Sequence, residues 1–401
     1  MSCYHPLKNF QVGYNIETKK PIYVTTSYKV QAIQKKTNGN GYDKMYELPS
    51  WDYILKYQST NRPVVTRQIE IPCGKCIGCR LAYSKEWANR CVLEAKEWEH
   101  NYSVTLTYDT MNLPDGEYTE HILDHQTGEL IGKTQATLND DDIVKFMKRL
   151  RKHFEKDQIY VINGMEFPYE KGKSILKHWE QDLGLKRNID FTLEIKGIRF
   201  FMCGEYGSQR ERPHYHMILF NIDLKDVEYI GKNKAGNPIW KSETIDKIWG
   251  KGLTVIGNVD WEFCAYTARY IMKKQKGPGS EDYYKEKGIM PEFVRMSRNP
   301  GIAKKYYDTH KKEMYETDSI YLQNRKGVQE VKPARYYDKL YDIEYPEEMK
   351  RIKENRRKLA EDAEKVALSK TTLSKEELLA VKERSIELKA RALKRGLESV
   401  V

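Results

Sequence analysis

Two histidines one residue apart mark the segment of the chain most suited to chemistry. Residues 212–220 read RPHYHMILF, with an apolar run directly after the second histidine. Residues two apart on a β-strand project from the same face, so His214 and His216 would stand side by side, with Tyr215 on the other face. Two neutral imidazoles held in this way can bind one divalent ion. A histidine pair that only forms hydrogen bonds would have the same sequence, so other segments must decide.

A carboxylate precedes the histidines and could complete a metal site. Glu205 lies in CGEYG, and the residues GSQRER that follow can form the turn of a hairpin. In such a hairpin Glu205 would lie across from the histidines. Two imidazoles and one carboxylate, with coordination positions left open, suit Mg²⁺ or Mn²⁺ bound to a phosphate substrate. Taken alone, Glu205 is better explained as a surface glutamate of a strand.

A predicted helix over residues 259–274 carries a second set of reactive side chains. At 100° per residue, Tyr266, Tyr270 and Lys273 share one face, and small and apolar side chains share the other. Tyrosine pairs at this spacing are common in a chain with 29 tyrosines, so the pair is informative only beside the histidines. A tyrosine hydroxyl has an unperturbed pKa of about 10 and needs a nearby cation to become a nucleophile. Lys273 or Lys274 could supply that charge or hold a phosphate.

Together these side chains describe a phosphoryl-transfer reaction. A metal held by His214, His216 and Glu205 would polarise a phosphodiester and stabilise the charge that develops on it. A tyrosine hydroxyl would attack the phosphorus, leaving a 5′-phosphotyrosine link and a free 3′-hydroxyl. A second tyrosine one helical turn away could attack a second phosphodiester, so that cleavage and rejoining alternate.

The composition is that of a folded, basic protein. The 401 residues are 39% hydrophobic and 11% aromatic, which excludes a disordered chain. Lysine and arginine exceed aspartate and glutamate by 69 to 58, and the resulting charge of +11 favours a polyanionic partner, nucleic acid before membrane. The N-terminal MSCYHPLKNF has no apolar signal-peptide core, and no stretch reaches the length of a membrane span. We therefore expect neither secretion nor membrane insertion.

Three of the seven cysteines lie in the turn CGKCIGC, at Cys73, Cys76 and Cys79. The spacing is tight enough for three thiolates to reach one ion, and we expect reduced thiols rather than disulfides. A structural zinc takes four ligands, and Cys3, His5 and Cys91 are available for the fourth position. We favour Cys3, because Cys91 lies on the apolar stripe of the helix that follows. An iron–sulfur cluster and three unligated thiols are the alternatives.

The remaining segments predict an α+β fold, with a central antiparallel sheet and flanking helices between a Cys-rich N-terminal element and a charged helical tail. Asn139 and the acidic residues after it predict the start of a helix whose apolar stripe ends at Phe154. Ser374 and Glu377 form a capping-box pattern in the tail, and we expect that helix to dock on its own domain rather than on a partner. The predicted divisions are an N-terminal region 1–100, a core 101–310 with insertions at 115–136, 155–188 and 229–240, and a tail 311–401.

The chain resembles a known family at several of these motifs. RPHYHMILF resembles the two-histidine strand of HUH endonucleases, and AYTARYIMKK resembles the two-tyrosine helix of the replication initiators of small single-stranded DNA phages. YSVTLTYD is similar to the first strand motif of rolling-circle initiators. CGEYG, PCGKCIGCR and PEFVRMSRNPGI resemble the gokushovirus branch of the Microviridae. The similarity runs from the N-terminus to about residue 310.

The resemblance implies an enzyme that nicks and rejoins phage DNA to start rolling-circle replication, on a sheet related to the RNA-recognition fold. It implies metal-ligand roles for His214 and His216, with Glu205 as a less regular third ligand. Tyr266 and Tyr270 take the nucleophile roles, and Lys273 is the accompanying lysine. We also predict DNA contacts from Lys274, Arg212 and Arg298. The implied partners are single-stranded and replicative-form phage DNA, a host helicase and a host polymerase, in the cytoplasm of the host bacterium.

Two other functions fit part of the sequence. A nucleic-acid-binding protein could keep the sheet and lose the chemistry, but the intact histidines and tyrosines disfavour this interpretation. An unrelated His-x-His metal hydrolase of small substrates gives no role to the tyrosine–lysine face or to the basic charge.

Overall fold

The protein divides into two units that are not simple runs of sequence. In this computed structural model, unit 1 joins the chain up to Ala82 with the segment that begins at Asn355, and unit 2 is Tyr83–Glu354. Both divisions fall inside helices, α2 (Ile77–Ala95) and α10 (Pro346–Ser369). A helix that passes between units leaves no loop or change of composition to mark the division, and the sequence motifs pointed instead to residues 100 and 310. The structure describes residues 3–14, 21–27, 29–30, 32–37, 43–48, 64–65, 68–123, 130–187, 189–207, 211–233, 236–269, 280–324 and 327–392.

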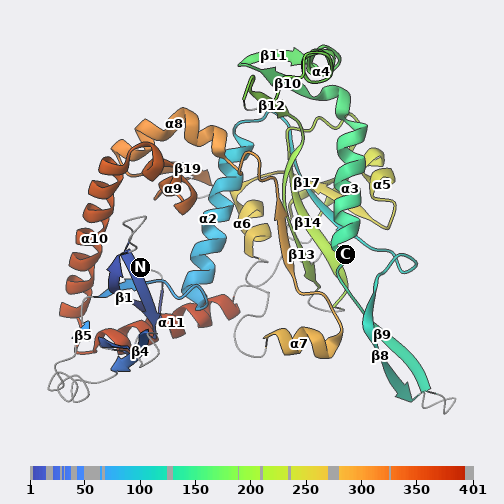
Figure 1. The fold of residues 1–401 in the computed structure, drawn as a ribbon. Helices are drawn as coiled ribbons and strands as arrows, with labels where there is room; N and C mark the ends of the chain where they lie inside the picture. The colour runs from blue at the N-terminus through green and yellow to red at the C-terminus, as the bar shows by residue number, and fades with distance from the viewer. Residues whose placement is uncertain are drawn as a thin grey trace. The chain divides into compact units, whose positions relative to one another are not determined.

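A seven-stranded antiparallel sheet forms the centre of unit 2 (Figure 1). The strand order is β15-β16-β17-β7-β14-β13-β18, and helices cover both faces, so the predicted α+β architecture is confirmed. The expected hairpin is present, because β13 pairs with β14 along its whole length. The strands are β7 (Asn101–Thr107), β13 (Arg199–Tyr206), β14 (Pro213–Phe220), β15 (Val227–Lys232), β16 (Pro238–Ser242), β17 (Thr254–Gly257) and β18 (Phe293–Met296).

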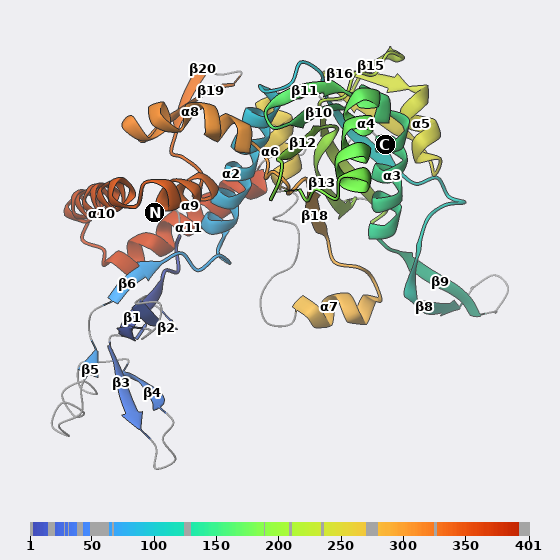
Figure 2. The same ribbon diagram turned by 45° about the horizontal axis from the view of Figure 1, so that its top comes forward.

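Strand β14 shows why both faces of the sheet are covered. Tyr215, Met217 and Leu219 are fully buried in one apolar cluster with helix α3 (Asp140–His153). The alternate residues Ile218 and Phe220 are buried in a second cluster with α2 and α6 (Trp261–Arg269). Figures 1 and 2 both show α3 on one side of the sheet and α6 on the other. A strand buried on both faces needs apolar residues at successive positions, which explains the run MILF.

Helix α3 begins where the sequence predicted. The Asn139 side chain accepts a hydrogen bond from the Asp142 amide, and three aspartates occupy the first turn, where negative charge is favourable. A polar contact then joins this end of the helix to the sheet. The Tyr215 hydroxyl accepts from the Asn139 amide at 2.8 Å, and the Tyr108 hydroxyl donates to the Asp142 carboxylate at 2.8 Å. The residue between the two histidines therefore anchors α3.

Insertions extend from the sheet at the expected places. Strands β8 (Asp115–Leu123) and β9 (Leu130–Ala136) pair as a hairpin. A small lobe has its own three-stranded sheet and a separate apolar cluster around Tyr160, Ile162 and Phe191. Its elements are η1 (Glu155–Asp157), β10 (Ile159–Ile162), β11 (Met165–Pro168), α4 (Tyr169–Lys177), η2 (His178–Asp182) and β12 (Leu193–Lys196). Strands β15 and β16 pair as the third insertion, and α5 (Glu243–Trp249) and α7 (Ser280–Lys287) complete this part.

Part of the predicted charged tail lies in the core of unit 2. Tyr307, Tyr315, Tyr337 and Tyr341 are buried in the same cluster as Phe201 of the central sheet. Tyrosines scattered among lysines and glutamates do not stand out as an apolar stripe, which is why the sequence suggested a solvated tail from 311 onward. The elements are α8 (Lys304–Glu316), β19 (Ile320–Asn324), β20 (Gly327–Val331) and α9 (Arg335–Glu344).

Unit 1 combines two small sheets with the C-terminal helices. The first sheet has the order β2 (Pro21–Thr26), β1 (Leu7–Tyr14), β6 (Gln68–Ile71), and the second has the order β4 (Asp43–Leu48), β3 (Ala32–Thr37), β5 (Val64–Val65). Helix α11 (Lys375–Ala392) follows the end of α10. Of the helices in the described part of the chain, none has both the length and the apolar character of a membrane span.

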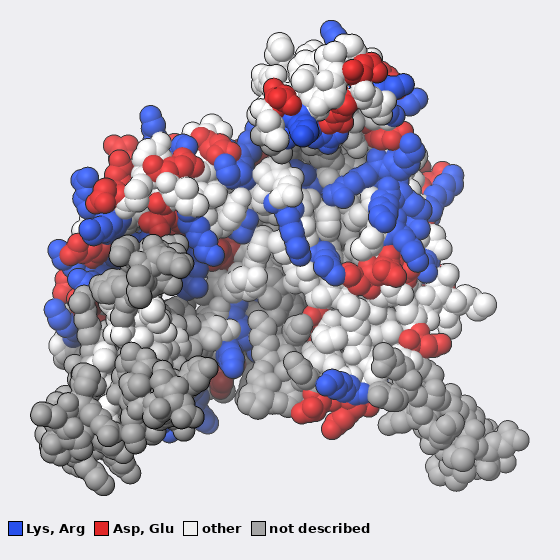
Figure 3. All heavy atoms as spheres, viewed as in Figure 1, with Lys and Arg blue, Asp and Glu red and all other residues white. Residues whose placement is uncertain are grey.

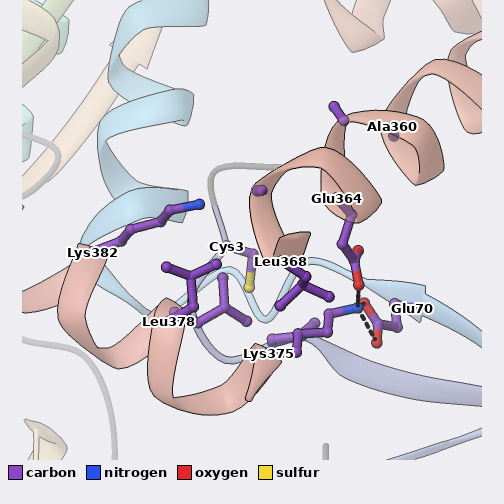
Figure 4. Close-up of a pocket in the computed structure, with 12 residues that line it drawn as sticks. Cys3, Glu70, Ala360, Glu364, Leu368, Lys375, Leu378 and Lys382 are labelled. Carbon is purple, nitrogen blue, oxygen red and sulfur yellow. Dashed lines mark hydrogen bonds and ion pairs between the residues drawn. The ribbon is translucent and has the colours of Figure 1, made fainter. Parts of the chain in front are cut away.

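Helix α11 is capped and docked within unit 1, as predicted. The Ser374 amide donates to the Glu377 carboxylate at 2.8 Å, and the Glu377 amide donates back to the Ser374 hydroxyl at 3.3 Å, which is a capping box. Lys375 pairs with Glu70 of β6 at 2.9 Å and with Glu364 of α10 at 2.7 Å (Figure 4). These contacts hold the C-terminal helices against the N-terminal strands.

Candidate active site on strands β13 and β14

The two histidines and Glu205 meet on the central strands of unit 2. The β13–β14 register pairs Glu205 with His214 and Cys203 with His216, so all three side chains project from one face. The Glu205 Oε1 atom lies 2.8 Å from His214 Nε2 and 3.1 Å from His216 Nε2. Neighbouring ligands of a metal with bonds of about 2.1 Å are about 3 Å apart, so the spacing fits one divalent ion. Glu205 is fully buried, which is not the surface position that its sequence alone suggested.

The other ring nitrogens of the histidines are held in place. His214 Nδ1 lies 3.1 Å from the Arg212 carbonyl oxygen, which can only accept a hydrogen bond, so Nδ1 carries the proton. In the neutral ring, Nε2 then presents a lone pair to the Glu205 carboxylate. A cation between these atoms removes the repulsion, and His216 Nε2 is close enough to share that cation. The donor set therefore fits a metal ion better than a purely hydrogen-bonded triad.

Glu205 is negatively charged in this setting. Burial by itself would raise the pKa of the carboxyl, but the hydrogen bonds from His214 and His216 outweigh burial and hold the pKa well below its ordinary value. A buried carboxylate requires a positive partner in contact with it. Two imidazoles around a shared metal ion meet that requirement.

Tyr266 lies beside this group on helix α6. The Phe263 amide donates to the Asp260 carboxylate at 2.7 Å and starts the helix. The Tyr266 ring packs edge-on against the His216 ring, with centroids 5.2 Å apart. The predicted polar face of the helix is thus turned toward the histidines, and Tyr266 is only 9% exposed. A DNA strand that reaches the phenolic oxygen therefore requires neighbouring side chains to move.

The helix is fixed against the sheet by buried residues. Cys203 lies beneath Tyr266 in one small apolar cluster, and its thiol donates to the Thr267 carbonyl at 3.4 Å. Cys264 is fully buried on the other side of α6, in the cluster with α2. Both cysteines are core residues, as their sequence context indicated. Tyr270, Lys273 and Lys274 lie outside the described residues.

The two predicted DNA-contacting arginines differ in position. Arg212 lies two residues before His214 and donates to the Tyr108 carbonyl at 3.0 Å, so it borders the histidines. Arg298 is exposed beyond the end of β18. The register pairs Phe293 with Gly204 and Met296 with Phe201, so β18 runs away from Glu205 on the way to Arg298. The structure brings Arg212, and not Arg298, to the metal-binding group.

The sequence analysis missed one side chain that contacts the histidines. The Thr105 hydroxyl on β7 lies 3.1 Å from His216 Nδ1, directly across the strand pair. The alternation of Ser103, Thr105 and Thr107 in YSVTLTYD is the signal that could have found it, because these positions share the face of the strand that meets the histidines.

We expect Thr105→Val to weaken metal binding by about 10- to 100-fold, because the valine cannot orient the His216 ring. Isothermal titration with Mn²⁺ measures the effect. Thr107→Val is the matched control on the same strand, since the Thr107 hydroxyl donates to the Leu253 carbonyl instead of a histidine. Equal affinities in the two variants would contradict an orienting role for Thr105.

The second predicted metal group lies in unit 1. The sulfur atoms of Cys3, Cys73, Cys76 and Cys79 are within 4.8 Å of one another. Cys3 therefore joins the C-x₂-C-x₂-C turn, as favoured above. The other candidates for the fourth position lie elsewhere: Cys91 is buried in the core of unit 2, and His5 contacts Glu383 at 2.6 Å.

Comparison with known proteins identifies the family. The family model for the replication-associated protein ORF2, or gene 2 protein, matches residues 165–275, which include β13, β14 and α6. The replication-associated protein ORF2 of Spiroplasma virus 4 is 33% identical over 344 residues, which cover 85% of this chain and 86% of the relative. This chain belongs to the phage replication-associated proteins. The gokushovirus resemblance of the motifs is thereby confirmed.

Other members of this family are more distant. The replication-associated protein VP4 of Bdellovibrio phage phiMH2K is 25% identical, over 69% of each chain. The replication-associated protein ORF4 of Chlamydia phage 1 is 27% identical, over 51% of this chain and 38% of the relative. No solved structure matches the chain.

The positive charge of this replication-associated protein is not confined to the site. Lysine and arginine side chains gather along α3 in Figure 3. Lys145, Lys148, Arg149, Arg151 and Lys152 are exposed there. Helix α3 covers the face of the sheet opposite the histidines, so these charges do not neutralise a phosphate at the metal-binding group.

Proposed function

We propose that the protein starts rolling-circle replication by nicking single-stranded DNA at the phage origin and later rejoining it, with Tyr266 as a nucleophile and Mg²⁺ or Mn²⁺ as cofactor. One observation carries the proposal: the Tyr266 ring packs on His216, whose imidazole shares the Glu205 carboxylate with His214. A potential nucleophile and a potential cation site thus lie side by side, in a family named for replication.

The reaction conserves the energy of the broken bond. The phenolic oxygen of Tyr266 attacks the phosphorus, a bond from oxygen to phosphorus forms, and the bond from phosphorus to the 3′-oxygen breaks. The leaving 3′-oxygen takes up a proton and becomes a hydroxyl that a polymerase can extend. Attack of a 3′-hydroxyl on the phosphotyrosine reverses the step and reseals the strand.

The side chains around the site have distinct roles. His214, His216 and Glu205 would hold the metal ion, which when bound supplies Lewis-acid stabilisation of the phosphoryl charge. The Arg212 carbonyl and the Thr105 hydroxyl orient the two imidazoles. Packing of α6 against Cys203 keeps the phenol next to the histidines.

We assign the sheet to the HUH endonuclease type. The paired histidines occupy a central strand, and the tyrosine helix packs on the same face of that sheet. Tyr270 would follow Tyr266 by one helical turn, with Lys273 beside it, so that two tyrosines could act in alternation. Phage single-stranded and replicative-form DNA are the proposed substrates, with a host helicase and polymerase as partners in the host cytoplasm.

Incubation with origin single-stranded DNA and Mn²⁺ tests the proposal. We expect a covalent protein–DNA adduct and a free 3′-hydroxyl, because the phenol keeps the 5′-phosphate. Mass spectrometry of the digested adduct identifies the tyrosine that carries the nucleotide. A protein that binds the DNA and forms no adduct would support the alternative, a nucleic-acid-binding protein with a non-catalytic sheet.

Arg212→Ala should weaken binding of single-stranded DNA and lower the salt dependence of log K by about 0.7, the change for one lost phosphate contact. Fluorescence anisotropy at several salt concentrations measures both effects. Arg151→Ala is the matched control, because Arg151 also donates to a backbone carbonyl, that of Ile198, but lies on α3 across the sheet. The same slope for Arg212→Ala and the unaltered protein would remove Arg212 from the DNA path.

A further inference from the structure

The cysteine group of unit 1 has the dimensions of an ion site. The sulfur of Cys73 lies 4.0 Å from that of Cys79, and the sulfur of Cys76 lies 4.0 Å from that of Cys3. Four thiolates around one zinc, with Zn–S bonds of about 2.3 Å, place their sulfurs about 3.8 Å apart. A disulfide needs about 2.05 Å between sulfurs, and all four cysteines are free.

The backbone around the sulfurs favours thiolates over thiols. The Cys73 amide donates to the Cys3 sulfur at 3.2 Å, the Cys76 amide donates to the Cys73 sulfur at 3.3 Å, and the Tyr4 amide donates to the Cys76 sulfur at 3.4 Å. Gly74 adopts φ = +73°, which turns the chain so that the amides after it point back at Cys73. Amide donors stabilise a negative sulfur, as ligand sulfurs in metal sites require.

The site is closed and lies at a junction of unit 1. Cys3, Cys76 and Cys79 are each at most 9% exposed, which is typical of a structural ion rather than a catalytic one. Cys79 lies in the first turn of α2, whereas Cys3 belongs to the N-terminal segment. Cys3 also faces Leu368 and Leu378 of the C-terminal helices (Figure 4). One ion would therefore tie together three distant parts of the chain.

The rest of unit 1 offers little apolar burial. In its described part, the other buried apolar cluster has only Phe10, Val30 and Ile33 at its centre. Small units with so little core are commonly stabilised by a bound metal.

We propose that Cys3, Cys73, Cys76 and Cys79 bind one Zn²⁺ that is required for the fold of unit 1. Four sulfur ligands in a closed tetrahedral arrangement select zinc among abundant divalent ions. Binding displaces the protons that remain on the four thiols into solution. The zinc site is separate from the metal-binding group on β13 and β14, and the proposal does not depend on the nicking activity.

Metal analysis of the purified full chain tests the site. We expect about one zinc per chain for the unaltered protein and for the control Cys91→Ala, which changes a buried thiol outside the group. Cys76→Ser should lose most of the zinc. Iron in place of zinc, or no metal with four freely reactive thiols, would overturn the proposal.

A second measurement remains informative if Cys76→Ser does not fold. Removal of zinc from the unaltered protein by a chelator should lower the melting temperature and speed proteolysis within α10 and α11, because Cys3 faces both helices. Added Zn²⁺ should restore protection, whereas Mg²⁺ should not. Substitution by Co²⁺ should produce the strong absorption of a tetrahedral tetrathiolate site. Unchanged melting and proteolysis after complete zinc removal would refute a role in the fold.

Discussion

The double replacement Tyr266→Phe with Tyr270→Phe abolishes the covalent protein–DNA adduct, with strand cleavage reduced at least about 10⁴-fold. Phenylalanine keeps the ring that packs on His216 and removes only the oxygen that would attack phosphorus. Either single replacement should leave one nucleophile, so turnover falls while an adduct still forms. Denaturing gels of labelled origin DNA measure the adduct directly.

Tyr321→Phe is the control for this series, because Tyr321 is exposed on β19 and lies outside the metal-binding group. It should form the adduct at the rate of the unaltered protein. A double variant that still becomes covalently attached to DNA would refute the nucleophile assignment and direct attention to another side chain near His216.

His214→Ala should reduce cleavage at least about 10³-fold while changing DNA affinity by less than about twofold. The variant loses a nitrogen that lies 2.8 Å from Glu205, so the cation is held less tightly where the phosphate must be polarised. Backbone contacts to DNA come mainly from lysine and arginine, which the replacement does not touch. Cleavage assays across a Mn²⁺ titration, together with anisotropy, separate the two effects.

Two further variants sharpen the test. His178→Ala removes an exposed histidine that pairs with Asp182 in the small lobe, and it should leave cleavage unchanged. Glu205→Gln keeps the shape of the side chain and removes its charge, so it should weaken Mn²⁺ binding as His214→Ala does. If His214→Ala lost DNA binding and cleavage together, the histidines would be structural.

Local pattern explains what could be foreseen about the site. The two-residue period of a strand is enough to place His214 and His216 on one face, and the turn GSQRER sets the hairpin that brings Glu205 across from them. The tight spacing of the cysteine turn similarly predicts that its three thiols converge. These contacts lie close together in the chain, so periodicity and turn chemistry specify them.

Contacts between distant segments were less visible. Thr105 reaches His216 only because β7 is the neighbour of β14, and strand order depends on which faces can be buried together. The tyrosines of α8 and α9 are buried because the central sheet offers an apolar surface to them. Neither fact has a local signature, since a threonine or tyrosine is equally suited to a surface.

The sequence by itself determined the chemical groups, the strand and helix that carry them, and the family to which the chain belongs. The tertiary structure decided that Glu205 is buried as an anion, that Tyr266 lies against His216, and that Cys3 completes the cysteine group. The physical reason is that burial and pairing between remote segments come from the packing of whole faces, whereas residue type and periodicity act over a few neighbours.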